Sequence, residues 1–279
     1  MPKTISAKKL ENILKITEEY VNSGNLIELK TKLDNNSYIP KVILKNFLNS
    51  TNQLVRNSTK SNTAGFIVIT GIDKTGKTTQ CFNPNKLKNI TSIYKVLIKM
   101  QKKVLKISLP TYTTYIGSLI SAYLGKESKF SISGKLSPDY AWILWSLDRA
   151  QYNNQVINWL NINKQHVVLA DRWTESNIAY QKAVGIDHKR ILEFEKKIIQ
   201  PNNIIILNMP IKILDKRSKN MKEKNDLYEE NNFLKNVQDI YLKLNKYYPY
   251  GTINIVNSND SVKTVNNNLI KIIKNIDFE

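Results

Sequence analysis

The sequence of 279 residues has one cysteine, few acidic residues for its number of basic ones, and no long apolar run. The lone Cys81 excludes an intramolecular disulfide and a zinc site built from cysteines, and it is typical of a reducing compartment. The absence of any run of about 18 apolar residues argues against a transmembrane helix. Met1–Leu10 has lysines but no apolar block behind them, so we expect no secretory signal and a cytoplasmic location.

Basic residues outnumber acidic ones, because 42 Lys and Arg stand against 23 Asp and Glu, for a net charge of +19. Such a charge favours anionic partners, which include nucleotides, nucleic acids and membrane surfaces, without choosing among them. The first 62 residues contain both signs of charge and are not a polybasic arm, so charge alone gives little support to nucleic-acid binding. We expect no membrane partner.

The first 62 residues predict a helical N-terminal extension. Leu10, Ile13 and Leu14 recur at near-helical spacing, and Pro40 opens a further run of apolar residues with helical period. The small and polar residues 57–64 (NSTKSNTA) predict a linker. We therefore divide the chain into an extension over residues 1–62 and a second domain over residues 63–279.

After the linker, short apolar runs alternate with longer segments of helical period. The runs of strand length are Phe66–Thr70, Val104–Leu109, Val167–Ala170, Ile204–Leu207 and Ile253–Val256. The helical segments between them are Leu87–Met100, Tyr140–Leu160, Lys189–Ile198 and Asn232–Lys246. This alternation predicts an α/β fold, a three-layer α/β/α domain with a five-stranded parallel sheet. Ligands of such sheets bind beyond the carboxyl ends of the strands.

The first of these strands leads into a phosphate-binding loop. Gly71–Thr79 (GIDKTGKTT) matches G-x-x-x-x-G-K-[ST], the P-loop motif, in which glycines let backbone N–H groups point at phosphate oxygens. Lys77 is expected to reach the β- and γ-phosphates of ATP, and the Thr78 hydroxyl to bind Mg²⁺. The residues expected to hold ATP are Gly71, Asp73, Lys74, Thr75, Gly76, Lys77, Thr78 and Thr79.

A second acidic residue follows the strand that ends near Ala170. Asp171 lies where P-loop enzymes place a carboxylate linked to magnesium, and Arg172 beside it can bind phosphate with two parallel hydrogen bonds. The metal ligands we expect are therefore Thr78 and Asp171. An aspartate that only caps the next helix is the alternative.

Five segments occur in the order found in thymidylate kinases, and the resemblance that they carry extends over about residues 65–275. They are Gly71–Gln80, Leu109–Leu124, Ser146–Arg149, Asp171–Gln181 and Asp226–Leu244. The chain thus resembles the thymidylate kinase family of P-loop nucleoside monophosphate kinases. The resemblance implies ATP and Mg²⁺ as cofactors, transfer of the γ-phosphoryl group of ATP to dTMP, and a homodimer, which is common in this family.

The resemblance also assigns the acceptor site. The matching positions are Asp73, Tyr112, Trp145, Arg149, Arg172, Ser176, Asn177, Tyr180, Gln181 and Tyr228. It implies that Asp73 binds the 3′-hydroxyl of the sugar, that Trp145 stacks on thymine and that Arg149 donates to a thymine carbonyl. Without the resemblance, Trp145 would be interpreted as a core residue.

Two arginines typical of the family are missing. The stretch after the second strand, residues 109–114, holds Tyr112 and threonines where an arginine usually grips the acceptor phosphate, so nearby lysines would have to compensate. The P-loop holds Lys74 where a catalytic arginine can stand, and the expected lid contains Arg217. We therefore expect Lys77, Arg172, Lys74 and Arg217 to stabilise the transferring phosphoryl group.

Two other functions remain open from the sequence. A kinase for another nucleoside monophosphate, such as dUMP, is favoured by the altered acceptor pocket. A non-catalytic protein that binds nucleotides or nucleic acid is favoured by the net charge and the missing arginines.

Overall fold

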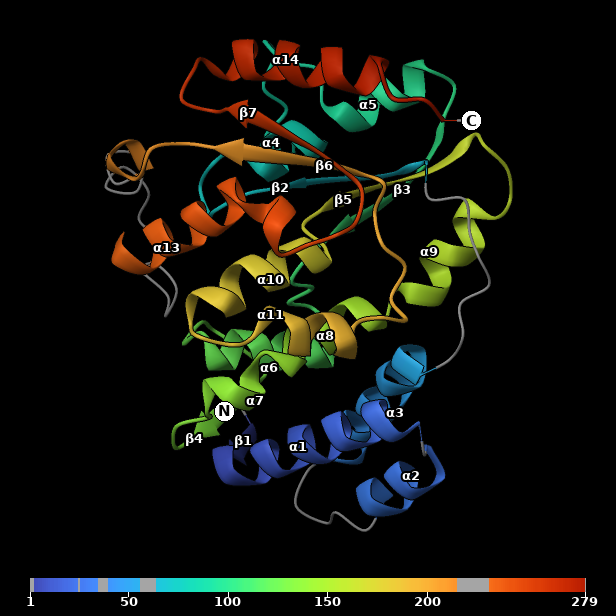
Figure 1. The fold of residues 1–279 in the computed structure, drawn as a ribbon, viewed down its shortest axis with the longest axis vertical. Coiled ribbons are helices and arrows are strands. Elements are labelled where there is room, and N and C mark those ends of the chain that lie inside the picture. Colours follow the sequence, from blue (N-terminus) through green and yellow to red (C-terminus); the bar gives the residue numbers. More distant parts are fainter. Residues whose placement is uncertain (1–2, 25, 35–39, 56–63, 215–230, 279) are drawn as a thin grey trace.

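The computed structural model describes residues 3–24, 26–34, 40–55, 64–214 and 231–278. A sheet of five parallel strands lies at its centre, in the order β3-β5-β2-β6-β7 (Figure 1). The strands are β2 (Phe66–Thr70), β3 (Lys103–Ser108), β5 (His166–Asp171), β6 (Asn203–Asn208) and β7 (Thr252–Asn257). The predicted parallel sheet is confirmed, and each strand extends at most two residues beyond the apolar run that predicted it.

Helices cover both faces of the sheet, which confirms the α/β/α layers. One face carries α4 (Lys77–Phe82), α5 (Ile93–Lys99) and α14 (Val262–Lys274). The other face carries α6 (Tyr115–Tyr123), α8 (Ile143–Ala150), α9 (Asn153–Leu160), α10 (Thr174–Ala183), α11 (His188–Phe194) and α13 (Asn231–Leu242). Successive residues of β2 point to opposite faces, so that Ile67 packs in the first layer and Val68 in the second.

The four predicted helices have different bounds in the structure. The helix predicted over Lys189–Ile198 is α11, which ends at Phe194, and the one predicted over Asn232–Lys246 divides into α13 and a 3-10 helix, Leu244–Lys246. The segment Tyr140–Leu160 forms three helices, α7 (Pro138–Ala141), α8 and α9, because short interruptions do not disturb a helical apolar period. The helix predicted from Leu87 begins at Ile93, where the Ser92 side chain caps it. Residues before it are held in a turn, because the amide of Leu87 donates to the Asn83 side chain at 2.9 Å. The helices α6, α10 and α14 were not predicted as elements.

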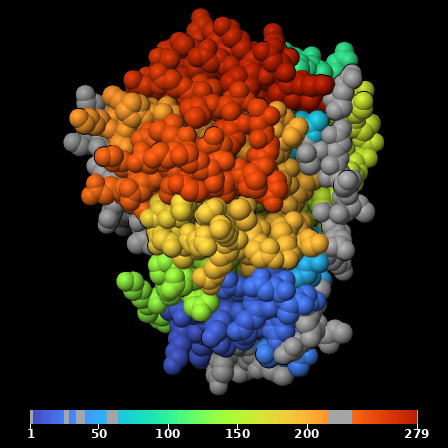
Figure 2. Space-filling model, in the orientation of Figure 1, coloured from blue at the N-terminus to red at the C-terminus, as the bar shows by residue number. Residues whose placement is uncertain are grey.

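The N-terminal extension contains α1 (Ala7–Ser23), α2 (Leu26–Asp34) and α3 (Lys41–Val55), as its periodicity predicted. It begins, however, with a strand, β1 (Lys3–Ser6), which pairs in parallel with β4 (Phe130–Ser133). A local pattern cannot reveal this strand, since its partner lies far along the chain. The extension packs against α6, α8 and α11 at one end of the molecule (Figure 2).

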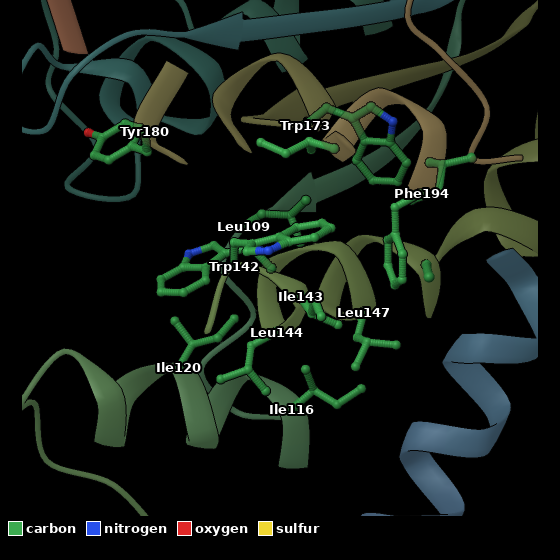
Figure 3. Close-up of a cluster of buried hydrophobic side chains, with 14 of the residues drawn as sticks. Leu109, Ile116, Ile120, Trp142, Ile143, Leu144, Leu147, Trp173, Tyr180 and Phe194 are labelled. Carbon is green, nitrogen blue, oxygen red and sulfur yellow. The ribbon is translucent and has the colours of Figure 1, made fainter. Parts of the chain in front are cut away.

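The extension and the rest of the described chain, which begins at residue 64, share one continuous apolar core. This core includes Leu10 and Phe47 of the extension together with Ile116, Leu144 and Trp142 of the other part. Figure 3 shows Ile116 and Leu144 between the ribbons of α6 and α8, with a helix of the extension beside them. Among the described residues, no helix is long and apolar enough to cross a membrane.

Candidate active site

The P-loop connects β2 to α4, as the motif predicted, and its conformation depends on glycine. Gly71 has φ +136°, and a Cβ there would lie 2.4 Å from the backbone oxygen of Leu207 on the neighbouring strand. Gly76 has φ +92° and precedes the first residue of α4. Both positions require backbone angles that L-residues rarely adopt, so the loop can curl in front of the helix only with glycine there.

Lys77 is buried at the start of α4 and faces the loop. Its Nζ donates to the carbonyl oxygen of Ile72 at 2.7 Å and lies 3.8 Å from Asp73 Oδ1. Burial, helped by the charge of Arg172, lowers the pKa of Lys77 from 10.5 to about 8, although Asp73 and Asp171 oppose this shift. Lys77 can therefore lose its charge at mildly alkaline pH.

The expected metal ligands meet at the carboxyl end of the sheet. Thr78 Oγ1 donates to Asp171 Oδ2 at 2.5 Å, and Asp171 lies opposite Ile69 in the register of β2 and β5. The other carboxylate oxygen, Asp171 Oδ1, is buried and has no hydrogen-bond partner in the described part of the chain. A hydroxyl and a carboxylate oxygen suit Mg²⁺, which is commonly held by one or two protein ligands plus substrate phosphates. These residues therefore fit a magnesium ion.

Arg172 connects the P-loop with the helix that follows β5. Its Nη2 donates to Asp73 Oδ1 at 2.5 Å and to the Tyr180 hydroxyl at 3.1 Å, while Nη1 donates to Ser176 Oγ at 3.0 Å and the Tyr241 hydroxyl at 3.3 Å. Burial alone would raise the pKa of Asp73, but the charges of Arg172 and Lys77 outweigh it and hold that pKa well below its usual range. Arg172 has φ +71°, a costly backbone conformation in a non-glycine residue.

A pocket lies beside this pair and leaves about 440 Å³ unoccupied by protein atoms. Nine of the ten predicted acceptor residues line it, all except Tyr228. Among the described residues, the lining consists of Asp73, Pro110, Tyr112, Leu124, Trp145, Arg149, Arg172, Ser176, Asn177, Tyr180 and Gln181. Tyr228 and the lid residue Arg217 lie outside the described residues. The lining combines aromatic and apolar side chains with a few polar and charged groups, which is typical of a small-molecule site.

Two residues of α8 form one wall of the pocket. Trp145 packs edge-on against Tyr123 with ring centroids 5.6 Å apart. Arg149 donates from Nε to the carbonyl of Trp173 at 2.7 Å and from Nη1 to the carbonyl of Trp145 at 2.6 Å, which fixes its guanidinium against the pocket. Trp142, on the same stretch of chain, is instead fully buried against Phe194. Of the two tryptophans, only Trp145 lines the pocket.

Helix α10 contributes two amide side chains, Asn177 and Gln181, to the pocket lining. Asn177 Nδ2 donates to Ser146 Oγ at 3.0 Å and to Glu195 Oε1 at 2.8 Å, which fixes the orientation of the amide. The remaining oxygen, Asn177 Oδ1, is buried without a hydrogen-bond partner among the described residues, as is Gln181 Nε2. The pocket lining therefore includes one unsatisfied acceptor and one unsatisfied donor.

Sequence reasoning did not single out Asp148, although it lies inside the quoted segment Ser146–Arg149. Asp148 is fully buried, and its Oδ2 accepts a hydrogen bond from the amide of Thr111 at 2.9 Å. Burial raises its pKa to about 6, against the effect of this hydrogen bond. Gly117 of α6 lets the loop that contains Thr111 lie directly against this helix, because a Cβ at position 117 would be 1.9 Å from the backbone oxygen of Thr111. Asp148 and Gly117 thus position the loop that carries Tyr112.

Lys126 is a cation near the position of the missing arginine. Its Nζ lies 3.5 Å from the hydroxyl of Tyr112 and 5.2 Å from the centre of that ring. It is also close enough to Asp73 to lower the pKa of that carboxyl. From the sequence, any of several lysines could have filled this role, because the contact depends on how the loop after α6 folds back.

Comparisons with known proteins agree on one family. The family model described as thymidylate kinase matches residues 69–269. A probable thymidylate kinase of Methanocaldococcus jannaschii is 31% identical over 213 residues, which cover 76% of this chain and 96% of the relative. A probable thymidylate kinase of Thermococcus kodakarensis is 28% identical, over 76% of this chain and 98% of its own length. A thymidylate kinase of Dictyostelium discoideum is 28% identical, over 74% and 83%.

The family model covers well over half of the chain, and it includes the P-loop, Asp171, Arg172 and the pocket residues. This match does not favour a non-catalytic binding protein or a different class of kinase. The chain therefore belongs to the thymidylate kinase family, whose members are nucleoside monophosphate kinases that use ATP as the phosphate donor.

Proposed function

We propose that the chain transfers the γ-phosphoryl group of ATP to dTMP, which yields dTDP and ADP, by the site residues described above. The observation that carries the proposal is the contact between Arg172 and Asp73, which sets the P-loop directly beside the pocket that the predicted acceptor residues line. A donor phosphate in the loop and an acceptor phosphate at Arg172 would then be neighbours. The proposal places the reaction in the cytoplasm, where the one cysteine, Cys81, is expected to stay reduced.

On the donor side, Lys77 and the P-loop backbone hold the phosphates, and Lys74 adds positive charge. Thr78 and Asp171 hold Mg²⁺, which supplies neutralisation of phosphate charge when it is bound. The buried oxygen Asp171 Oδ1 supports this assignment, because a buried carboxylate oxygen without a partner is costly unless a ligand satisfies it. Arg217 is proposed as the lid cation that approaches the transferring group.

On the acceptor side, the two amides of α10 suit a thymine or uracil ring. The imide N–H of such a base would donate to Asn177 Oδ1, and a neighbouring carbonyl would accept from Gln181 Nε2. Cytosine has an acceptor in place of that N–H, which would face the oxygen of Asn177 and lose a hydrogen bond. Trp145 would stack on the ring, Arg149 would donate to its other carbonyl, and Tyr228 is proposed to contact the base.

The sugar and the acceptor phosphate would lie beside the bonded pair Asp73 and Arg172, both of which line the pocket. Asp73 stays ionised at neutral pH because Arg172 and Lys77 lower its pKa, so it can accept a hydrogen bond from a 3′-hydroxyl. The acceptor phosphate is already an anion and needs no general base. The residues therefore act by positioning the two phosphates and by stabilising charge on the group in transfer.

We expect ADP release in the presence of ATP, Mg²⁺ and dTMP, and much slower release with dCMP, dGMP or dAMP. Lys77→Ala should lower kcat at least about a hundredfold, because charge on the transferring group loses its nearest cation, while the exposed Lys95→Ala should change nothing. A coupled assay of ADP with each monophosphate measures this. Turnover of dUMP but not of dTMP would show that the acceptor is dUMP and not dTMP. No turnover with any of the monophosphates would refute the proposed function.

The KM for ATP should rise with pH above about 8, because triphosphate binding needs the charged form of Lys77. Its pKa in the free enzyme is lowered to about 8, so the charged fraction is nearly complete at pH 7 and falls about tenfold per pH unit well above 8. Initial rates from pH 6.5 to 9.5 at saturating dTMP measure this. A KM for ATP that stays constant up to pH 9.5 would contradict the assignment.

Lys126→Met should raise the KM for dTMP about tenfold and leave the KM for ATP nearly unchanged, because it removes the cation next to Tyr112. Lys129→Met is the matched control, because Lys129 follows α6 in the same segment but contacts other groups: its Nζ donates to the carbonyl of Thr113 at 3.3 Å and lies 5.7 Å from the centre of the Tyr115 ring. Equal effects of both substitutions would show that Lys126 acts only through general charge.

A further inference from the structure

The N-terminal extension is additional to the part of the chain shared with its relatives. The family model begins at residue 69, and the two archaeal relatives align over nearly their whole length with only 76% of this chain. A kinase of this family can therefore be built without these helices. Yet the extension is tightly integrated here, since it shares the apolar core with α6 and α8.

The extension covers an apolar face that the kinase part cannot leave in water. All eight residues of α8 are buried, and the central residues of α6, including Leu119 and Ile120, are buried as well. One side of α8 forms the pocket wall with Trp145 and Arg149, and α3 packs against both α8 and α6. Figure 3 shows Ile116, Ile120 and Leu144 where α6 faces α8, with a helix of the extension to one side. Without α3, this face would be a large exposed apolar patch, the kind of surface that usually binds a second copy.

A polar contact extends from the extension toward the base-binding amides. Glu18 of α1 accepts two hydrogen bonds from Arg190 of α11, at 2.5 and 2.6 Å. Glu195 directly follows α11, and its carboxylate accepts hydrogen bonds from Ser146 and Asn177. The extension thus holds the helix that fixes the orientation of Asn177, as well as the helix that carries Trp145.

We propose that the N-terminal extension replaces a second subunit: it covers the face of α6 and α8, makes the chain a monomer and holds the acceptor pocket in shape. The homodimer predicted from the family resemblance could not form through the face of α6 and α8, because the extension already covers it. The part of the inference that concerns dTMP rests on the proposed function. The parts that concern mass and rigidity do not.

The test compares two pairs of matched variants in the full chain. Glu18→Gln breaks the ion pair with Arg190, and Glu19→Gln makes the same change at its exposed neighbour. Phe47→Ala opens a cavity in the fully buried side of α3, and Val42→Ala alters its exposed side. The readouts are sedimentation mass, the two KM values, and amide hydrogen exchange of α8, α10 and α11 compared with α4 and α5.

We expect the wild type to sediment at its chain mass of 32.2 kDa at about 1 to 50 μM. Glu18→Gln should raise the KM for dTMP about threefold and Phe47→Ala about tenfold, with the KM for ATP unchanged and with faster exchange in α8, α10 and α11 only. The two controls should match the wild type.

A wild-type dimer would overturn the inference. Amide exchange that becomes faster in α4 and α5 by as much as in α8, α10 and α11 would also overturn it. So would exchange and KM values that stay at the wild-type level in both test variants. Should the wild type fail to phosphorylate dTMP, the proposed function fails. Mass and exchange then still decide the inference, because neither depends on turnover. Glu18→Gln keeps the test valid even if Phe47→Ala does not fold.

Discussion

The contact between Arg172 and Asp73 is the interaction on which the rest of the site depends. It joins the P-loop, which belongs to the donor side, to the first residues after β5, which belong to the acceptor side. The guanidinium is buried and also bonded to Ser176, Tyr180 and Tyr241, so a single side chain fixes α10 and α13 relative to the loop. Its strained backbone, with φ +71°, is tolerated because these contacts determine its position.

The acceptor pocket is held by buried groups that do not line it. Asp148 binds the amide of Thr111, Glu195 fixes the amide of Asn177, and the extension packs behind both α6 and α8. Such supporting contacts matter because charge stabilisation in phosphoryl transfer depends on groups that are already in place before the reaction. The loop that carries Tyr112 has no arginine for the acceptor phosphate. Lys126, which follows α6, places a positive charge beside Tyr112 from outside that loop.

The sheet and the P-loop could be predicted because their signals are local. Five apolar runs predicted five strands, and the motif Gly71–Thr79 places glycine at the two positions where the loop has a positive φ that requires it, Gly71 and Gly76. Asp73 and Arg172 could be found from the P-loop and from the end of a strand, but the other seven pocket residues came from a resemblance, and the roles of all nine remain predictions. Contacts between distant segments could not be predicted: the pairing of β1 with β4, the ion pair of Glu18 with Arg190 and the position of Lys126 all depend on how the helices pack. Arg217 and Tyr228 lie outside the described residues.

The account's central claim is that Arg172 connects the two nucleotide sites, and Arg172→Lys tests it most directly. Lysine keeps the charge but cannot bond to Asp73, Ser176, Tyr180 and Tyr241 at once. Measured kcat/KM for dTMP should fall about a hundredfold or more, while the affinity for ATP, measured by calorimetry without dTMP, stays within about threefold of the wild type. A variant with kcat/KM for dTMP close to that of the wild type would contradict the account.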